Sequence, residues 1–165
     1  MKKLSTRDLT FAAIIGAIYV VLGCFGNTFN LTFGVIQCRF SEALTVLPFL
    51  APVTTWGVFI GCLITNILSP YGLLDMIFGP LATLLAALLT ARCRKKWLAP
   101  LPPVLCNAVI IGALIAFQEV GLSGAFPAVF AYNALTVGLG QVLVCYGLGM
   151  VLLSVMERVL PRFRV

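Results

Sequence analysis

The 165 residues are mostly apolar: 61% are hydrophobic, only 10% are charged, and the mean hydropathy is +1.11. A soluble domain carries roughly 25% charged residues, so this composition excludes a water-soluble globular protein and predicts a surface that faces lipid. The absence of histidine removes Ser-His-Asp and Cys-His nucleophiles and HExxH zinc chemistry. We therefore expect no enzymatic activity and no metal or cofactor.

Nearly all basic residues lie in three groups, at residues 2–7, 92–96 and 158–164, which explains the net charge of +6. Short basic segments flanking membrane spans stay in the cytoplasm, so this pattern predicts a multi-pass cell-membrane protein with both termini cytoplasmic. The basic residues are not interleaved with aromatic ones, so we expect no nucleic-acid partner. The six cysteines form no CxxC pair or metal-ligand spacing and are expected to be small core residues.

The first apolar run predicts a transmembrane helix from Leu9 to about Cys24, with Gly23 and Gly26 beginning to break it. The segment that follows, residues 25–38, alternates polar and apolar residues between Asn and Gly. It predicts an ordered extracellular loop or a short hairpin.

The next uncharged stretch, Ala43 to Leu74, is shorter than the roughly 40 residues that two full helical crossings need. An even number of crossings is nevertheless required, because the basic group at residues 92–96 should lie inside. Pro48 and Pro52 divide the stretch, which predicts short helices over residues 41–50 and 54–68.

Three further spans are predicted at residues 74–91, 102–118 and 129–156. The sequence shows no internal repeat of the kind that many self-contained transporters carry. The predicted fold is therefore an all-α integral membrane protein, with six transmembrane helices forming a single domain over residues 1–165.

Four charged residues are not explained by the cytoplasmic flanks: Arg39, Glu42, Asp75 and Glu119. The predicted topology places all four at the outer ends of helices, where ionisable groups indicate a functional site. The simpler alternative is that helix ends meet water there, and that Arg39 and Glu42 merely pair at i,i+3.

Amide side chains add to this outward cluster. Asn133 and Gln141 fall on one face of the last span together with Thr136 and Gly140. Amides buried in lipid need partners from neighbouring helices or from a ligand. We favour a ligand for Asn133 and Gln141 but structural packing for the deeper Asn107. The predicted substrate-binding residues are Arg39, Glu42, Asn66, Asp75, Gln118, Glu119, Tyr132, Asn133 and Gln141.

Carboxylates, amides and aromatic faces together suit a flat small molecule rich in N–H donors, including a cationic one. Phe29, Phe33, Tyr71 and Tyr132 supply the aromatic faces, whereas a single arginine suits a phosphate poorly. The sequence contains no GxxxxGK[ST] motif, so we expect no nucleotide site in this chain.

Small residues form a smooth face on the first predicted span. Such a face either packs within the bundle or docks another membrane protein. The predicted partner-interface residues are Ala12, Ala13, Gly16 and Ala17.

Three segments resemble the QueT family of queuosine-precursor transporters: residues 37–52, which include RFSEAL, residues 75–112, which include APLPPVL, and residues 137–149, with VGLGQVLVCYGLG. These transporters are substrate-capturing S components of energy-coupling factor (ECF) importers. The resemblance implies a six-helix S component that binds a 7-deazaguanine, such as 7-aminomethyl- or 7-cyano-7-deazaguanine or queuine. It also implies that the small-residue face contacts a transmembrane T component coupled to two cytosolic ATPase subunits.

The match to the family's motif implies a substrate-recognition role for Arg39 and Glu42. The other predicted site residues are inferred from the predicted topology. Three alternatives stay open. They are an S component for another vitamin-like molecule, a self-contained oligomeric channel or facilitator, and an intramembrane enzyme or assembly chaperone that uses the outward acids.

Overall fold

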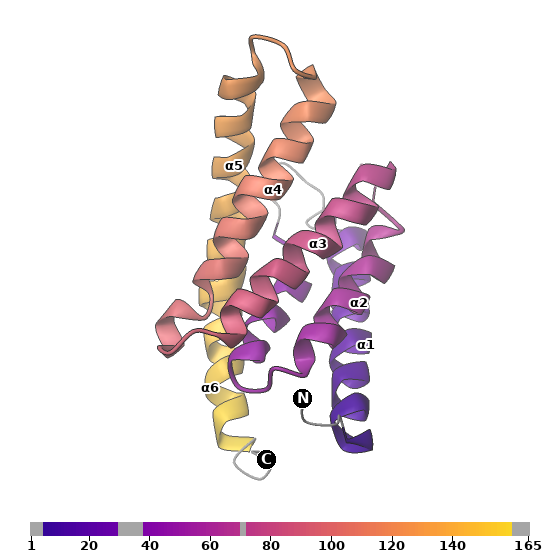
Figure 1. The fold of residues 1–165 in the computed structure, drawn as a ribbon, viewed down its shortest axis with the longest axis vertical. Helices are drawn as coiled ribbons and strands as arrows, with labels where there is room; N and C mark the ends of the chain where they lie inside the picture. The colour runs from indigo at the N-terminus through magenta and orange to yellow at the C-terminus, as the bar shows by residue number, and fades with distance from the viewer. Residues whose placement is uncertain (1–4, 30–37, 70–71, 160–165) are drawn as a thin grey trace.

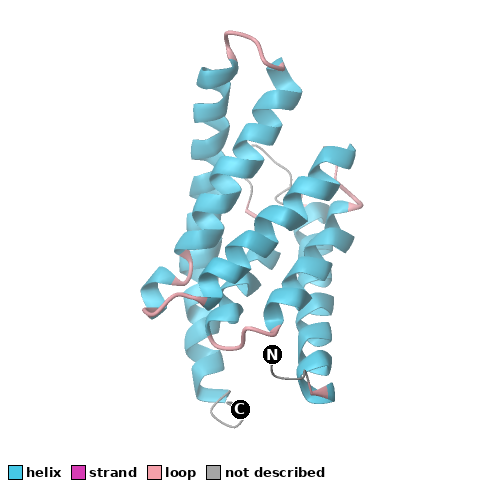
Figure 2. Ribbon diagram, viewed as in Figure 1, coloured by secondary structure: helices cyan, strands magenta, loops and turns pink. Residues whose placement is uncertain are grey.

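The computed structural model describes residues 5–29, 38–69 and 72–159, and in these ranges it is built from helices without strands (Figures 1 and 2). Four segments are long and apolar enough to cross a membrane. They carry many exposed leucine, isoleucine and valine side chains, as expected of a multi-pass membrane protein. The segments are α1 (Thr6–Thr28), α3 (Gly72–Ala91), Lys96–Val120 with η2 (Lys96–Leu98) and α4 (Leu101–Val120), and Phe126–Val159 with α5 (Phe126–Val142), η3 (Leu143–Gly149) and α6 (Met150–Val159).

Two shorter helices lie between α1 and α3: the 3-10 helix η1 (Phe40–Phe49) and α2 (Thr54–Asn66). The proline pair divides them as the sequence predicts, with Pro48 in the last turn of η1 and Pro52 in the connection to α2. Both are shorter than the roughly 20 residues of a full crossing. The positions of the predicted helices are thus confirmed, while six complete crossings stay a prediction.

The predicted end of the first helix is wrong, because α1 continues through Gly23 and Gly26 to Thr28. Gly23 serves helix packing instead: a Cβ at this position would lie 2.5 Å from the methyl group of Thr65 on α2. Continuing the helix also keeps the backbone hydrogen bonds satisfied in lipid. Residues 30–37 of the predicted loop or hairpin lie outside the described part of the chain.

Helices α1 and α2 lie side by side through small residues (Figure 1). A Cβ added to Gly16 would lie 2.9 Å from the carbonyl oxygen of Gly57, and one added to Gly61 would lie 2.8 Å from the carbonyl oxygen of Gly16. The two backbones therefore touch, as in small-residue interfaces of membrane helices. The core beside this contact contains Ile15, Tyr19, Leu44, Leu47, Val58, Cys62 and Ala87.

Both ends of the described chain lie at one end of the bundle, and the α4–α5 turn lies at the other (Figure 1). Near the terminal end, η2 is tied to α6 by an ion pair, in which Lys96 Nζ lies 2.6 Å from Glu157 Oε2. Arg92, Arg94 and Lys95 are exposed in the connection before η2. The described basic segments therefore lie at the same end of the bundle. Which side of a membrane this end faces stays a prediction.

Candidate functional site

A buried carboxylate, Glu42 on η1, forms the centre of a polar network inside the bundle. Its Oε1 accepts hydrogen bonds from the Tyr19 hydroxyl at 2.5 Å and from Thr83 Oγ1 at 3.4 Å. Its Oε2 accepts one from Asn107 Nδ2 at 3.3 Å. Glu42 is 0% exposed, so donors from α1, α3 and α4 replace the water that a carboxylate would otherwise bind.

Arg39, which precedes η1, extends the network toward α2 and α3. Its Nη2 donates to Asn66 Oδ1 and lies 3.9 Å from Cys62 Sγ. Asn66 Nδ2 in turn donates to the backbone carbonyl of Asp75 at 3.0 Å. The guanidinium also interacts electrostatically with Glu42 and Asp75. One buried cation therefore lies among two buried carboxylates, which reduces the cost of holding each charge away from water.

Asp75 lies in the first turn of α3 and is buried beside Asn66. Gly79, one turn further along α3, makes this arrangement possible. A Cβ at Gly79 would clash with Asn66 Nδ2 and lie 3.2 Å from Asp75 Oδ1. The absence of a side chain at Gly79 thus leaves space for the Asn66 amide and the Asp75 carboxylate.

The last long helical segment joins the network through Gln141 and Cys145. Cys145 Sγ lies 3.5 Å from Gln141 Oε1 and 3.6 Å from the backbone carbonyl of Glu42. Here the helix changes to the π-helical segment η3, and π-helical turns occur frequently at functional sites. Gly149 lets this segment approach η1, since a Cβ there would lie 3.0 Å from Val46.

The structure therefore brings Arg39, Glu42, Asn66, Asp75 and Gln141 into one network. The remaining predicted residues form a second group on the hairpin of α4 and α5, where Asn133 Nδ2 donates to Glu119 Oε2 at 3.0 Å. Glu119 follows Asn107 by 12 residues along α4, which is about 18 Å. The side chains of Gln118, Glu119 and Tyr132 in this second group are exposed.

Sequence reasoning missed Tyr19, Thr83, Cys62 and Cys145 as members of the network. A single hydroxyl or thiol in an apolar span gives no periodic signal, because these side chains often occupy ordinary core positions. Among the aromatic residues predicted to stack on a ligand, Phe33 and Tyr71 lie outside the described residues. Phe29 is exposed and packs edge-on against Phe25, with ring centroids 5.1 Å apart.

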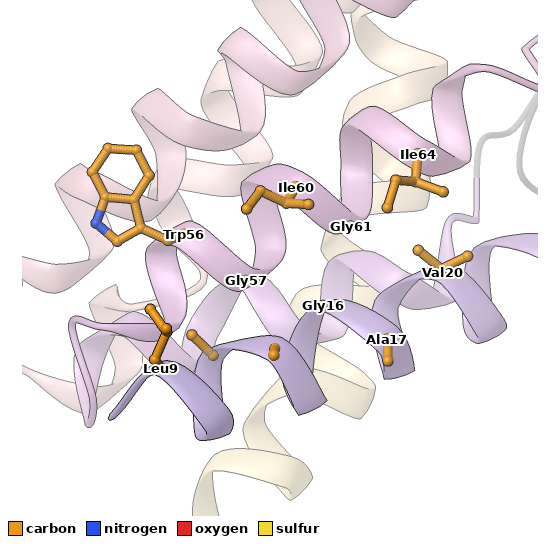
Figure 3. Close-up of a pocket in the computed structure, with 11 residues that line it drawn as sticks. Leu9, Gly16, Ala17, Val20, Trp56, Gly57, Ile60, Gly61 and Ile64 are labelled. Carbon is orange, nitrogen blue, oxygen red and sulfur yellow. The ribbon is translucent and has the colours of Figure 1, made fainter. Parts of the chain in front are cut away.

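The predicted partner-interface residues line an open apolar groove of about 380 Å³ between α1 and α2 (Figure 3). Ala12 and Gly16 are buried against α2, whereas Ala13 and Ala17 are exposed. Trp56 stands at one end of the groove. The other lining side chains include Leu9, Val20, Ile60 and Ile64.

Comparison with known proteins adds independent information. A protein of Lactococcus lactis subsp. cremoris (strain MG1363) named "Queuosine precursor transporter QueT" is 39% identical over 84 residues, which cover 51% of this chain and 49% of that protein. The match thus spans about half of the relative's length. No solved structure matches the chain. The family model described as QueT transporter matches residues 9–158. This match covers most of the sequence and confirms the resemblance found from the sequence motifs, so the chain belongs to the QueT transporter family.

Proposed function

We propose that this protein is the substrate-capturing S component of an ATP-driven ECF importer, and that it binds a queuosine precursor of the 7-deazaguanine class from outside the cell. The family match and the name of the Lactococcus lactis relative support a transporter for such a precursor. The observation that carries the proposal is the buried polar network around Glu42, because ionisable groups inside a membrane protein mark ligand or ion sites.

The chemistry of this network suits a deazaguanine. Carboxylates accept hydrogen bonds from the ring N–H and amino groups of a guanine-like edge, and amides accept or donate beside them. Arg39, Glu42, Asn66, Asp75 and Gln141 form the inner part of the proposed site. The group of Gln118, Glu119, Tyr132 and Asn133 forms its outer part, on the side from which the ligand enters.

The groove between α1 and α2 is the proposed docking surface for the transmembrane T component. The exposed residues Ala13 and Ala17 of α1 line it, and small residues allow two membrane helices to approach closely. ATP would be hydrolysed by two cytosolic ATPase subunits, which agrees with the lack of a GxxxxGK[ST] motif in this chain. Six crossings and cytoplasmic termini belong to the same proposal.

Binding to the detergent-purified chain alone tests the proposed substrate. Calorimetry or thermal shift should compare 7-aminomethyl-7-deazaguanine, 7-cyano-7-deazaguanine, queuine, guanine, biotin and riboflavin. Tight and selective binding of one deazaguanine is expected. Selective binding of biotin or riboflavin would show that the substrate is a vitamin and not a deazaguanine. Binding of none of the six compounds would overturn the capture function.

A second experiment tests the docking surface. Ala13→Trp fills the groove with an indole, so it should abolish co-purification with the T component and uptake while sparing ligand binding. Ala131→Trp, at an exposed position on α5, is the matched control and should leave assembly intact. If Ala13→Trp assembles and transports normally, the groove is not the interface. Uptake by vesicles that contain this chain alone would instead support a self-contained facilitator.

A further inference from the structure

Two acceptor atoms of the network, Asp75 Oδ2 and Asn107 Oδ1, have no hydrogen-bond partner among the described residues. Both side chains are only 1% exposed. Buried polar atoms in native proteins nearly always have a hydrogen-bond partner, and exceptions need an explanation. Because both atoms belong to the network around Glu42, the missing partners point to N–H or O–H donors on a molecule that binds there.

The orientation of the Asn107 amide is determined by Glu42. A carboxylate oxygen can only accept hydrogen bonds, so the amide nitrogen of Asn107 must face Glu42 Oε2, at 3.3 Å. The amide oxygen consequently points away from Glu42 and is left as the free acceptor. Glu42 thus controls which end of this amide a ligand meets.

Glu42 itself has little capacity left for a ligand. Tyr19 and Thr83 donate to one of its oxygens, and Asn107 donates to the other. Three of the approximately four lone-pair positions of a carboxylate are therefore used by the protein. Asp75 differs, because Asn66 donates to its backbone carbonyl and leaves side-chain Oδ2 free.

We infer that Asp75 and Asn107 accept hydrogen bonds from the ligand directly, and that Glu42 is a positioning residue that turns the Asn107 oxygen toward the ligand. The inference rests on the proposed function and narrows its substrate class. The ligand is a heteroaromatic molecule that presents at least two N–H donors, one for each of these acceptors. Molecules that lack one of these donors leave a buried acceptor unpaired and bind more weakly.

The test compares two ligands with the purified full chain: the deazaguanine that binds best, and its analogue without the exocyclic amino group. Wild type should prefer the amino form by about tenfold or more. Asp75→Asn replaces the carboxylate with a neutral amide that has a single acceptor oxygen. It should weaken binding of the amino form about tenfold and reduce its preference over the analogue.

Glu42→Gln tests the positioning role separately. The Gln amide would donate toward Asn107, so the Asn107 amide would turn over and present its NH₂ group to the ligand. The preference for the amino form should then fall or reverse, an outcome that simple loss of stability does not produce. Glu157→Gln, in the partly exposed pair with Lys96, is the matched carboxylate-to-amide control and should leave both affinities unchanged.

The outcomes separate the two levels of proposal. Wild type that binds neither ligand would refute the proposed function itself. Wild type that discriminates, with a preference unchanged by both Asp75→Asn and Glu42→Gln, would refute this inference alone. If Asp75→Asn fails to fold, Asn107→Leu removes the second acceptor and keeps the branched shape of the side chain. An unchanged preference in that variant would overturn the role of Asn107.

Discussion

Gly61→Ala should separate α1 from α2 and disturb the polar network at the same time. The added Cβ would lie 2.8 Å from both the Gly16 carbonyl oxygen and the Tyr19 Cβ, whereas ordinary contact begins at 3.4 Å. One helix must therefore move by about 0.6 Å, the difference between these distances, and neither contacting group is the flexible end of a side chain. Overpacking of this kind costs about 1–3 kcal/mol.

The Ala substitution also raises helix propensity by up to about 1 kcal/mol, which partly offsets this cost. Gly138→Ala isolates that gain, because Gly138 lies inside the α-helix α5 and a Cβ there meets only Ala108 Cβ, at 3.4 Å. The difference in the free energy of unfolding between the two variants should thus be about 1–3 kcal/mol, the overpacking cost alone.

The assay is reversible unfolding of the purified protein in mixed micelles, followed by helical circular dichroism. The ligand affinity of Gly61→Ala should also fall, because the displaced side chain is Tyr19, which donates to Glu42 at 2.5 Å. If Gly61→Ala and Gly138→Ala unfold at the same denaturant concentration, the backbone contact between α1 and α2 is absent and the reasoning fails.

Three smaller perturbations test other contacts. Tyr19→Phe removes a donor from the buried Glu42 carboxylate and should cost about 1.5–3 kcal/mol of unfolding free energy; an unchanged stability would show that Glu42 does not need this bond. A double-mutant cycle on Lys96 and Glu157, which are partly exposed, should give a coupling of about 0.2–1 kcal/mol that declines with salt; a salt-independent coupling would contradict the ion pair. Ser5→Ala breaks the capping box with Asp8 and should cost about 1 kcal/mol, visible as faster amide exchange in the first turn of α1, whereas Ser5→Thr should retain protection.

The helix positions could be predicted because proline, charge and apolar length act locally. Pro48 and Pro52 separate η1 from α2, and the basic residues after Ala91 mark the end of α3. The end of α1 could not be predicted in this way. Gly23 disfavours an isolated helix, but it is required where α1 contacts Thr65, and a partner distant in sequence leaves no local signal.

The residues of the site likewise include some that could be predicted from the sequence and some that could not. Arg39, Glu42, Asn66 and Asp75 are polar or charged residues near predicted helix ends, so the predicted topology selects them, and the structure joins them in one network. Asn107 is predicted to serve helix packing because it lies deepest in the membrane among the predicted amides. Its role as donor to Glu42 depends on how η1 lies against α4, and no periodicity encodes that contact.

The shortness of α2 has a consequence for the surrounding bilayer. Its 13 residues rise about 20 Å, whereas the hydrocarbon core is about 30 Å thick. Trp56, Ile60 and Ile64 are exposed along this short helix, so if α2 crosses the membrane as proposed, the lipid beside it must thin or leave apolar chains near polar headgroups. Hydrophobic mismatch of this kind costs a fraction of a kcal/mol per Å. A protein neighbour that covers α2 removes that cost, so membrane thickness itself shifts the balance between lipid and protein contacts on this face.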